Sequence, residues 1–114
     1  MTRRRPTPRS IADKFKRDVK ELRDRCPPLL PVRVYRRKLE NCLGTTSVTY
    51  DRKGYVRGFV IVVADNISWD ATWQILVHEW AHTLAWHEGH ETVDDHGPEW
   101  ALALARVYQE TVEP

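Results

Sequence analysis

Apolar and polar positions follow a helical repeat near the start of the chain, between a segment rich in arginine and proline and a pair of prolines. The repeat is carried by Ile11, Phe15, Val19 and Leu22. Ser10 can cap this helix, and Pro27-Pro28 end it. Residues 1–9 show no periodicity, so we expect a flexible basic arm followed by an amphipathic helix that keeps its basic face in water.

Three β-rich runs follow the proline pair. In the first, which starts at Val32, apolar residues alternate with basic or aromatic residues through Tyr35. The second covers residues 45–50 and is followed by the turn sequence 51–54. The third, residues 55–64, is more continuously apolar, which is typical of a strand that is buried on both sides. We expect three short strands joined as an antiparallel β-meander.

Two further helices are predicted in the C-terminal half. Ser68 can cap the first, and residues 69–86 are apolar almost all round, as in a helix that runs through the middle of a domain. After a polar loop, Pro98 suits the first turn of the last helix. The apolar stripe of that helix consists of Trp100, Ala103, Leu104, Val107 and Tyr108. Residues 10–114 are therefore expected to form one α+β domain with an N-terminal helix, the meander, a central helix and a closing helix.

The central helix carries an H-E-x-x-H pattern, His78-Glu79-Trp80-Ala81-His82. Residues four apart lie on one helix face, about one turn apart, so the two imidazoles can converge on one ion. Glu79 is rotated by about 100° from His78, which takes its carboxylate off the metal and toward a metal-bound water. Zinc with three protein ligands lowers the pKa of its bound water to about 7, and a nearby carboxylate can then act as the general base.

The third metal ligand must follow His82, and His96 is the favoured candidate. His96 stands immediately before a Gly-Pro pair, so a rigid turn would fix the direction of its side chain. His87 and His90 come directly after the central helix and would need a sharp chain reversal to reach the ion. These two histidines and Glu99 stay open as alternatives.

Other residues between the last two helices are candidates for supporting roles. A metzincin site is not expected, because the glycine and the third histidine that its spacing requires are replaced. Asp94 and Asp95 can accept a hydrogen bond from the second nitrogen of a liganding imidazole, or they can remain solvated. His87 and His90 are candidates for stabilising a tetrahedral oxyanion.

The two motifs resemble those of the SprT-like domain, the Spartan-type metalloprotease family. Beside the H-E-x-x-H pattern, residues 96–100 read His-Gly-Pro-Glu-Trp, which is similar to the family's H-G-P-E-[FW] element. The resemblance extends more loosely over residues 10–112. It implies a zincin-like fold, with zinc held by His78, His82 and His96 and with Glu79 as the catalytic base. Members that are known to cleave DNA-bound proteins carry further DNA-binding or zinc-ribbon parts, for which the basic residues 3–38 are the candidate substitute here.

Charge is distributed unevenly along the chain, although the formal net charge is only +2. Residues 1–38 contain 14 Lys and Arg and 4 Asp and Glu, whereas residues 39–114 contain 4 Lys and Arg and 12 Asp and Glu. A basic half of this kind can contact nucleic acid, or it can be a solvated helix face and an arm that leans on the acidic half. Nucleic acid is therefore kept as a candidate partner beside a protein or peptide substrate.

Length and composition limit the remaining choices. At 114 residues and 41% hydrophobic content, the chain fits one domain with a modest core. Cys26 and Cys42 are too few for a disulfide scaffold, so we expect two free buried thiols, with one bridge as the alternative. The basic start lacks the apolar stretch of a secretion signal, and no run approaches the roughly 18 apolar residues that span a bilayer. We expect a cytoplasmic protein with no membrane partner.

These observations predict a zinc metallopeptidase that hydrolyses peptide bonds through a zinc-activated water, with Glu79 as the general base and Zn2+ as the cofactor. The main alternative is a non-hydrolytic zinc-containing module that binds nucleic acid or protein. A hydrolase of non-peptide amides is a second alternative, because the zinc-bound water does not by itself select the acyl group. The sequence predicts neither the oligomeric state nor a cleavage preference.

Overall fold

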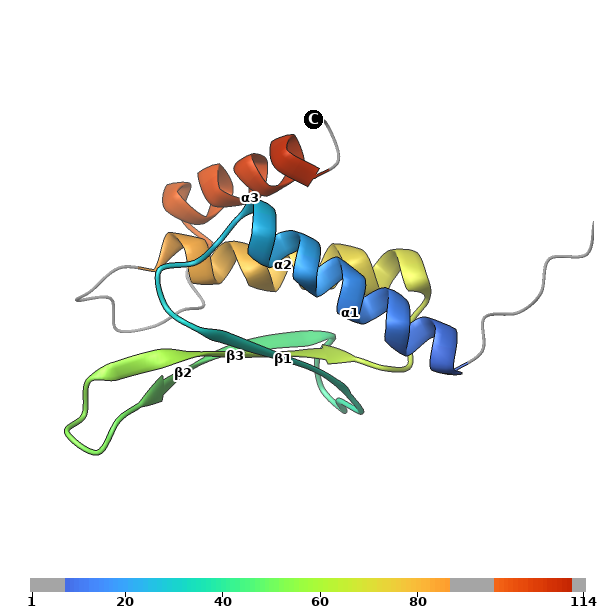
Figure 1. The fold of residues 1–114 in the computed structure, drawn as a ribbon, viewed down its shortest axis with the longest axis horizontal. Helices are drawn as coiled ribbons and strands as arrows, with labels where there is room; N and C mark the ends of the chain where they lie inside the picture. The colour runs from blue at the N-terminus through green and yellow to red at the C-terminus, as the bar shows by residue number, and fades with distance from the viewer. Residues whose placement is uncertain (1–7, 87–95, 112–114) are drawn as a thin grey trace, which may run out of the picture.

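In the described part of the chain, three helices lie on one side of a three-stranded sheet (Figure 1). The computed structural model describes residues 8–86 and 96–111. Its elements are α1 (Pro8–Arg25), β1 (Val32–Arg37), β2 (Gly44–Tyr50), β3 (Val56–Ala64), α2 (Trp69–Ala85) and α3 (Pro98–Thr111). Helix α2 packs on β2 and β3, and α3 packs on α2 on the side away from the sheet. The predicted α+β class is confirmed.

The sheet is mixed and has the order β1-β3-β2, so the predicted antiparallel meander is wrong. Strand β3 is antiparallel to β2, as in a hairpin, but parallel to β1. The physical reason lies in the apolar run of β3. In a meander this strand would occupy an edge, with one row of backbone groups unpaired, whereas the central position pairs both of its edges.

Helix α1 begins at Pro8, two residues before the predicted N-cap, so Ser10 lies inside the helix. Proline suits the first helical turn because the N–H that it lacks would have no helical partner there. Farther along the helix, Phe15, Val19 and Leu22 are buried, as their spacing predicts. The start of the helix was misplaced, but the face that it buries was predicted correctly.

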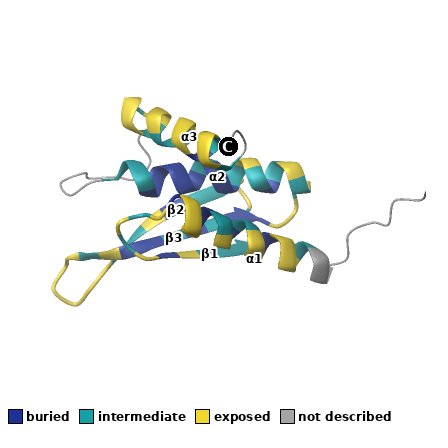
Figure 2. Ribbon diagram, turned by 45° about the horizontal axis from the view of Figure 1, so that its top comes forward, coloured by how far each residue is buried: buried dark blue, intermediate teal, exposed yellow. Residues whose placement is uncertain are grey.

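The core lies between the sheet and the two helices α1 and α2, and Figure 2 shows the buried positions concentrated on α2 and β3. The helix-facing side chains of β3 are Phe59, Ile61 and Val63, each at most 2% exposed. Trp80 of α2 is fully buried, and its indole Nε1 donates a hydrogen bond of 2.9 Å to the Cys26 carbonyl oxygen. This bond satisfies the indole and ties α2 to the end of α1.

Two predicted local signals are confirmed on either side of β3. Gly54 in the hairpin turn has a φ of 85°, a conformation in which glycine is not strained. Ser68 caps α2, because its hydroxyl accepts a hydrogen bond of 3.2 Å from the Ala71 backbone N–H. Of the described helices, none has the length and apolar character to cross a bilayer.

The two cysteines are both free, but only one is buried. The prediction of two buried thiols is correct for Cys26 and wrong for Cys42, which is exposed. Cys42 lies in the connection before β2, where the chain runs over the surface. Burial raises the pKa of the Cys26 thiol, so this side chain stays protonated and acts as a small apolar residue of the core.

Gly44, at the start of β2, allows α2 to approach the sheet closely. A Cβ atom there would lie 2.5 Å from Cγ2 of Ile75 and 3.1 Å from Cγ of Glu79. We expect Gly44→Ala to lower the free energy of unfolding by about 1–3 kcal/mol, because α2 must shift away from the strand. Thermal unfolding measures this change. Ser47→Ala, at an exposed position of the same strand, should stay within about 0.5 kcal/mol, and equal effects would contradict the argument.

Candidate metal centre

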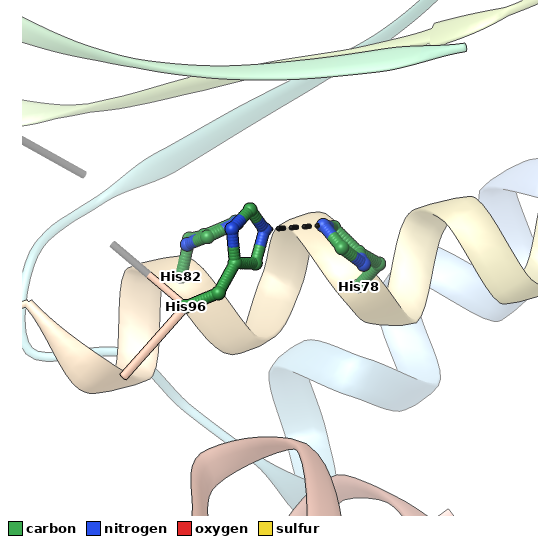
Figure 3. Close-up of side chains that lie close together, drawn as sticks. All are labelled: His78, His82 and His96. Carbon is green, nitrogen blue, oxygen red and sulfur yellow. Dashed lines mark hydrogen bonds between the residues drawn. The ribbon is translucent and has the colours of Figure 1, made fainter. Parts of the chain in front are cut away.

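Three histidines, two from α2 and one from the segment just before α3, lie together, as Figure 3 shows. Their ring centroids form a triangle with sides of 5.2 Å (His78 to His82), 5.0 Å (His78 to His96) and 4.7 Å (His82 to His96). The Nε2 atoms of His78 and His96 are 3.0 Å apart. One ring nitrogen from each residue lies within 4.8 Å of the other two, so this group could hold a metal ion.

Helix α2 supplies two of the three rings. His78 and His82 are four residues apart and therefore project from one face of the helix. His78 is half-buried, and His82 is 3% exposed. The rotation of the helix is fixed by its apolar neighbours Leu76, Val77 and Trp80, which are fully buried in the core. Packing of the core thus directs the two histidines toward α3.

The segment just before α3 supplies the third ring, that of His96. The Ala101 backbone N–H donates a hydrogen bond of 3.1 Å to the Gly97 carbonyl oxygen, which starts the helix directly after His96. The Trp100 indole Nε1 donates a hydrogen bond of 3.2 Å to the His78 carbonyl oxygen. The Trp100 ring centroid is 4.8 Å from those of His78 and of His96. Trp100 therefore ties α3 to α2 and closes one side of the histidine group.

The donor set and its spacing fit a metal ion. Three nitrogens at about 2.0–2.1 Å from a tetrahedral zinc ion would be about 3.4 Å apart. The observed spacing, 3.0 Å for one pair and at most 4.8 Å for the set, needs only small rotations of the side chains. Burial, and then the neighbouring His96, lower the pKa of His78, which favours the neutral imidazole that a metal requires.

Glu79 is held by β2 on the sheet side of α2. Its side chain is 7% exposed, and its carboxylate Oε2 accepts a hydrogen bond of 2.5 Å from the Thr46 hydroxyl. The same hydroxyl lies 3.2 Å from the Glu79 carbonyl oxygen. A threonine hydroxyl has one proton to donate, and a charged acceptor makes the shorter and stronger bond. Thr46 thus fixes the orientation of a buried carboxylate that is next to His78 in the chain.

The structure brings His78, His82 and His96 into one group, which is the set that sequence reasoning favoured. Glu99, an alternative third ligand, lies in the first turn of α3 and is not part of this group. The other predicted site residues, His87, His90, Asp94 and Asp95, lie outside the described residues.

Thr46 and Gly44 were missed by sequence reasoning. Alternation along β2 does place residues 44 and 46 on one face of the strand, and that signal was available. It does not say which helix the face meets. The role of these residues depends on contact between β2 and α2, which is a property of the folded chain.

Comparison with known protein families gives a match over most of the chain. A family model described as the SprT-like family matches residues 11–113. Neither the curated proteins nor the solved structures gave a match to the chain. The matched range contains the three strands, α2, α3 and all three histidines.

Proposed function

The chain belongs to the SprT-like family, and from this premise we propose that it is a zinc metallopeptidase with a zincin-like fold. The observation that carries the proposal is the group of three imidazoles, with a buried glutamate beside it on the same helix. Catalytic zinc sites have three protein ligands and one open position, whereas structural zinc sites have four protein ligands. The three histidines, with Glu79 next to His78 on the same helix, match the donor set of a catalytic zinc site.

Zinc is the metal that we assign to this group. Imidazole nitrogens also suit copper, iron and nickel, so the choice rests on the H-E-x-x-H pattern together with the three-histidine set. When bound, zinc supplies a water of pKa near 7 and polarises the scissile carbonyl. His78, His82 and His96 would hold it, and Trp100 would keep water from one side of the site.

Glu79 is proposed as the group that moves the proton. Its carboxylate accepts a proton from the attacking water and then passes it to the leaving amine. The hydrogen bond from Thr46 to Oε2 holds this carboxylate in place. The fixed carboxylate needs no reorientation during the reaction, which is the advantage of a preorganised base.

Thr46 should contribute to the rate through Glu79. We expect Thr46→Val to lower kcat for peptide cleavage by about tenfold or more with KM and zinc content little changed, because a hydrogen bond to a charged group contributes about 1.5–3 kcal/mol. Thr46→Ser keeps the hydroxyl and should recover most of kcat. Steady-state kinetics and zinc analysis of both variants test the role, and a valine variant with wild-type kcat would exclude it.

The position of β2 supports a peptide as the substrate. This strand is an edge of the described sheet, and it carries Thr46, the partner of Glu79. An edge strand presents unpaired backbone N–H and C=O groups, to which an extended peptide can add as a further strand. A peptide bound in this way would lie close to the proposed base. A small amide has no extended backbone and could not bind as a further strand.

A panel of substrates tests the proposed function. Zinc-loaded protein should cleave unfolded casein, lose this activity to a chelator and regain it with zinc. A small acylated amine that offers no extended backbone should be cleaved far more slowly. The opposite preference would favour a non-peptide amide hydrolase, and zinc-loaded protein that cleaves neither substrate would favour a non-hydrolytic module.

A further inference from the structure

Strand β1 forms the edge of the described sheet that lies opposite to β2. Just before it, the Pro31 carbonyl oxygen accepts a hydrogen bond of 2.9 Å from the Phe59 N–H. At its end, the Arg37 carbonyl oxygen accepts one of 3.0 Å from the Asp65 N–H. Backbone groups of successive residues in a strand point to opposite edges, so the odd-numbered residues of β1 face β3. Its even-numbered residues therefore turn their N–H and C=O groups outward.

The outward backbone groups belong to Val32, Val34 and Arg36. The Arg23 guanidinium of α1 donates a hydrogen bond of 2.5 Å to the Val32 carbonyl oxygen, so α1 already satisfies one of these groups. No described strand pairs with this edge. Val34 and Arg36 thus present two N–H and two C=O groups with which a further strand could pair.

A hollow of about 350 Å³ lies beside this edge, between α1 and β1. In both ribbon views α1 lies over the β1 side of the sheet (Figures 1 and 2). The apolar lining of the hollow consists of Phe15 and Val19 from α1 and Val34 from β1. Because side chains alternate along a strand, a strand paired with Val34 would direct every second side chain toward the helices and the hollow.

Cations surround the hollow on the helix side. Lys16, Lys20 and Arg23 line it, together with one carboxylate, that of Asp24. The Lys20 Nζ atom lies 2.6 Å from the Asp24 Oδ2 atom, so these two charges compensate each other. Lys16 and Arg23 leave the surroundings of the hollow with a net positive charge, which is complementary to an anionic partner.

The opposite face of β1 is basic as well. Arg33 and Arg37 alternate with Val34, so they project from the face away from the helices, and both are exposed. The Arg37 guanidinium lies over the Tyr35 ring, 4.3 Å from its centroid. A strand added at this edge would therefore have cations beside its side chains on both faces.

These features select one kind of occupant. A second copy of β1 is disfavoured, because like charges would lie opposite each other. A chain of carboxylates alone would leave the apolar hollow unfilled. A nucleic acid has no row of N–H and C=O groups to pair with Val34 and Arg36. An extended protein segment in which acidic and apolar residues alternate fits the charge, the hollow and the backbone groups together.

We propose that β1 binds an acidic segment of a partner protein as an added strand, with an apolar side chain in the hollow and carboxylates beside Lys16, Arg33 and Arg37. This site is separate from the proposed substrate edge, because β1 and β2 lie at opposite edges of the sheet. It does not depend on hydrolysis at the histidine group, because none of its residues belongs to that group.

Fluorescence anisotropy with the zinc-loaded full chain tests the proposal. The probe is a labelled peptide of about nine residues in which glutamate alternates with valine and leucine, and mass spectrometry checks that it stays intact. Replacing its valines and leucines by serine should weaken binding by about tenfold or more, because no apolar side chain would then enter the hollow. Polyglutamate or an oligonucleotide that binds as tightly as the probe would overturn the proposal.

A pair of variants tests whether the charges beside β1 matter by their position. Lys16→Gln/Arg33→Gln should weaken binding of the probe by about fivefold, since two exposed ion pairs are lost. Arg52→Gln/Lys53→Gln removes the same charge from exposed positions of the hairpin turn and should keep the affinity within about twofold. Equal losses in the two variants would refute a site at β1. Circular dichroism checks that both variants are folded.

Hydrogen exchange resolved by residue locates the bound peptide. At a saturating concentration of the probe, the N–H groups of Val34 and Arg36 should exchange at least tenfold more slowly, with exchange along β2 unchanged. Protection confined to β2 would assign the peptide to the proposed substrate edge. Unchanged exchange at Val34 and Arg36 would exclude an added strand, and either result would overturn the proposal.

Discussion

Glu79→Gln should lower the rate of peptide cleavage by a factor of about 10²–10⁴ while leaving the zinc content unchanged. Glutamine keeps the size of the side chain, and its amide oxygen can still accept the hydrogen bond from Thr46, so the buried site should stay intact. The amide cannot take a proton from water near neutral pH. Initial rates on casein and elemental zinc, measured on the same preparations, separate a chemical effect from a loss of metal.

Glu99→Gln is the matched control for this change. It makes the same substitution at an exposed position in the first turn of α3, outside the histidine group. Its cleavage rate and zinc content should stay close to those of the wild type. Substantial cleavage by Glu79→Gln would refute the role of Glu79 as the base. Loss of zinc in Glu99→Gln would assign the third ligand to Glu99.

His96→Ala should weaken zinc binding by more than a hundredfold and abolish cleavage at the zinc concentration that saturates the wild type. Changes in the groups that only support metal ligands already cost about 10–100-fold in affinity, and the loss of a ligand should cost more. The variant would leave two nitrogens from α2, one fewer than the three protein ligands of a catalytic zinc site. Competition with a chromophoric chelator measures the affinity independently of activity.

His87→Ala and His90→Ala are the controls for the loss of an imidazole. Both should keep the zinc affinity of the wild type, because our proposal places neither at the metal. A lower turnover in these variants, with zinc retained, would support the expected role in stabilising the oxyanion. Wild-type zinc affinity in His96→Ala, together with weak binding in His87→Ala or His90→Ala, would move the third ligand into the loop.

The positions of the elements could be predicted because their signals are local. The spacing of Phe15, Val19 and Leu22 defines the buried face of α1, and the Ser68 hydroxyl defines the start of α2. Strand order has no local signal. Alternation along β1 has the same form in a parallel and in an antiparallel pair, so the parallel pairing with β3 could not be deduced from it.

The site residues that could be predicted also have local signals in the sequence, and those that could not be predicted have none. The four-residue spacing of His78 and His82 follows from helix geometry, and His96 was favoured by the Gly-Pro pair that follows it. Thr46 lies 33 residues before Glu79 in the chain and meets it only because α2 packs on β2. A contact of that kind depends on strand register and helix position, which no short motif encodes.

Zinc content and casein cleavage, measured together on the wild-type chain after removal of metal and stepwise return of zinc, test the central claim most directly. We predict that cleavage rises in proportion to bound zinc and reaches a plateau at about one zinc ion per chain. Failure to bind zinc under metal-replete conditions, or zinc-saturated protein that does not cleave, would contradict the account.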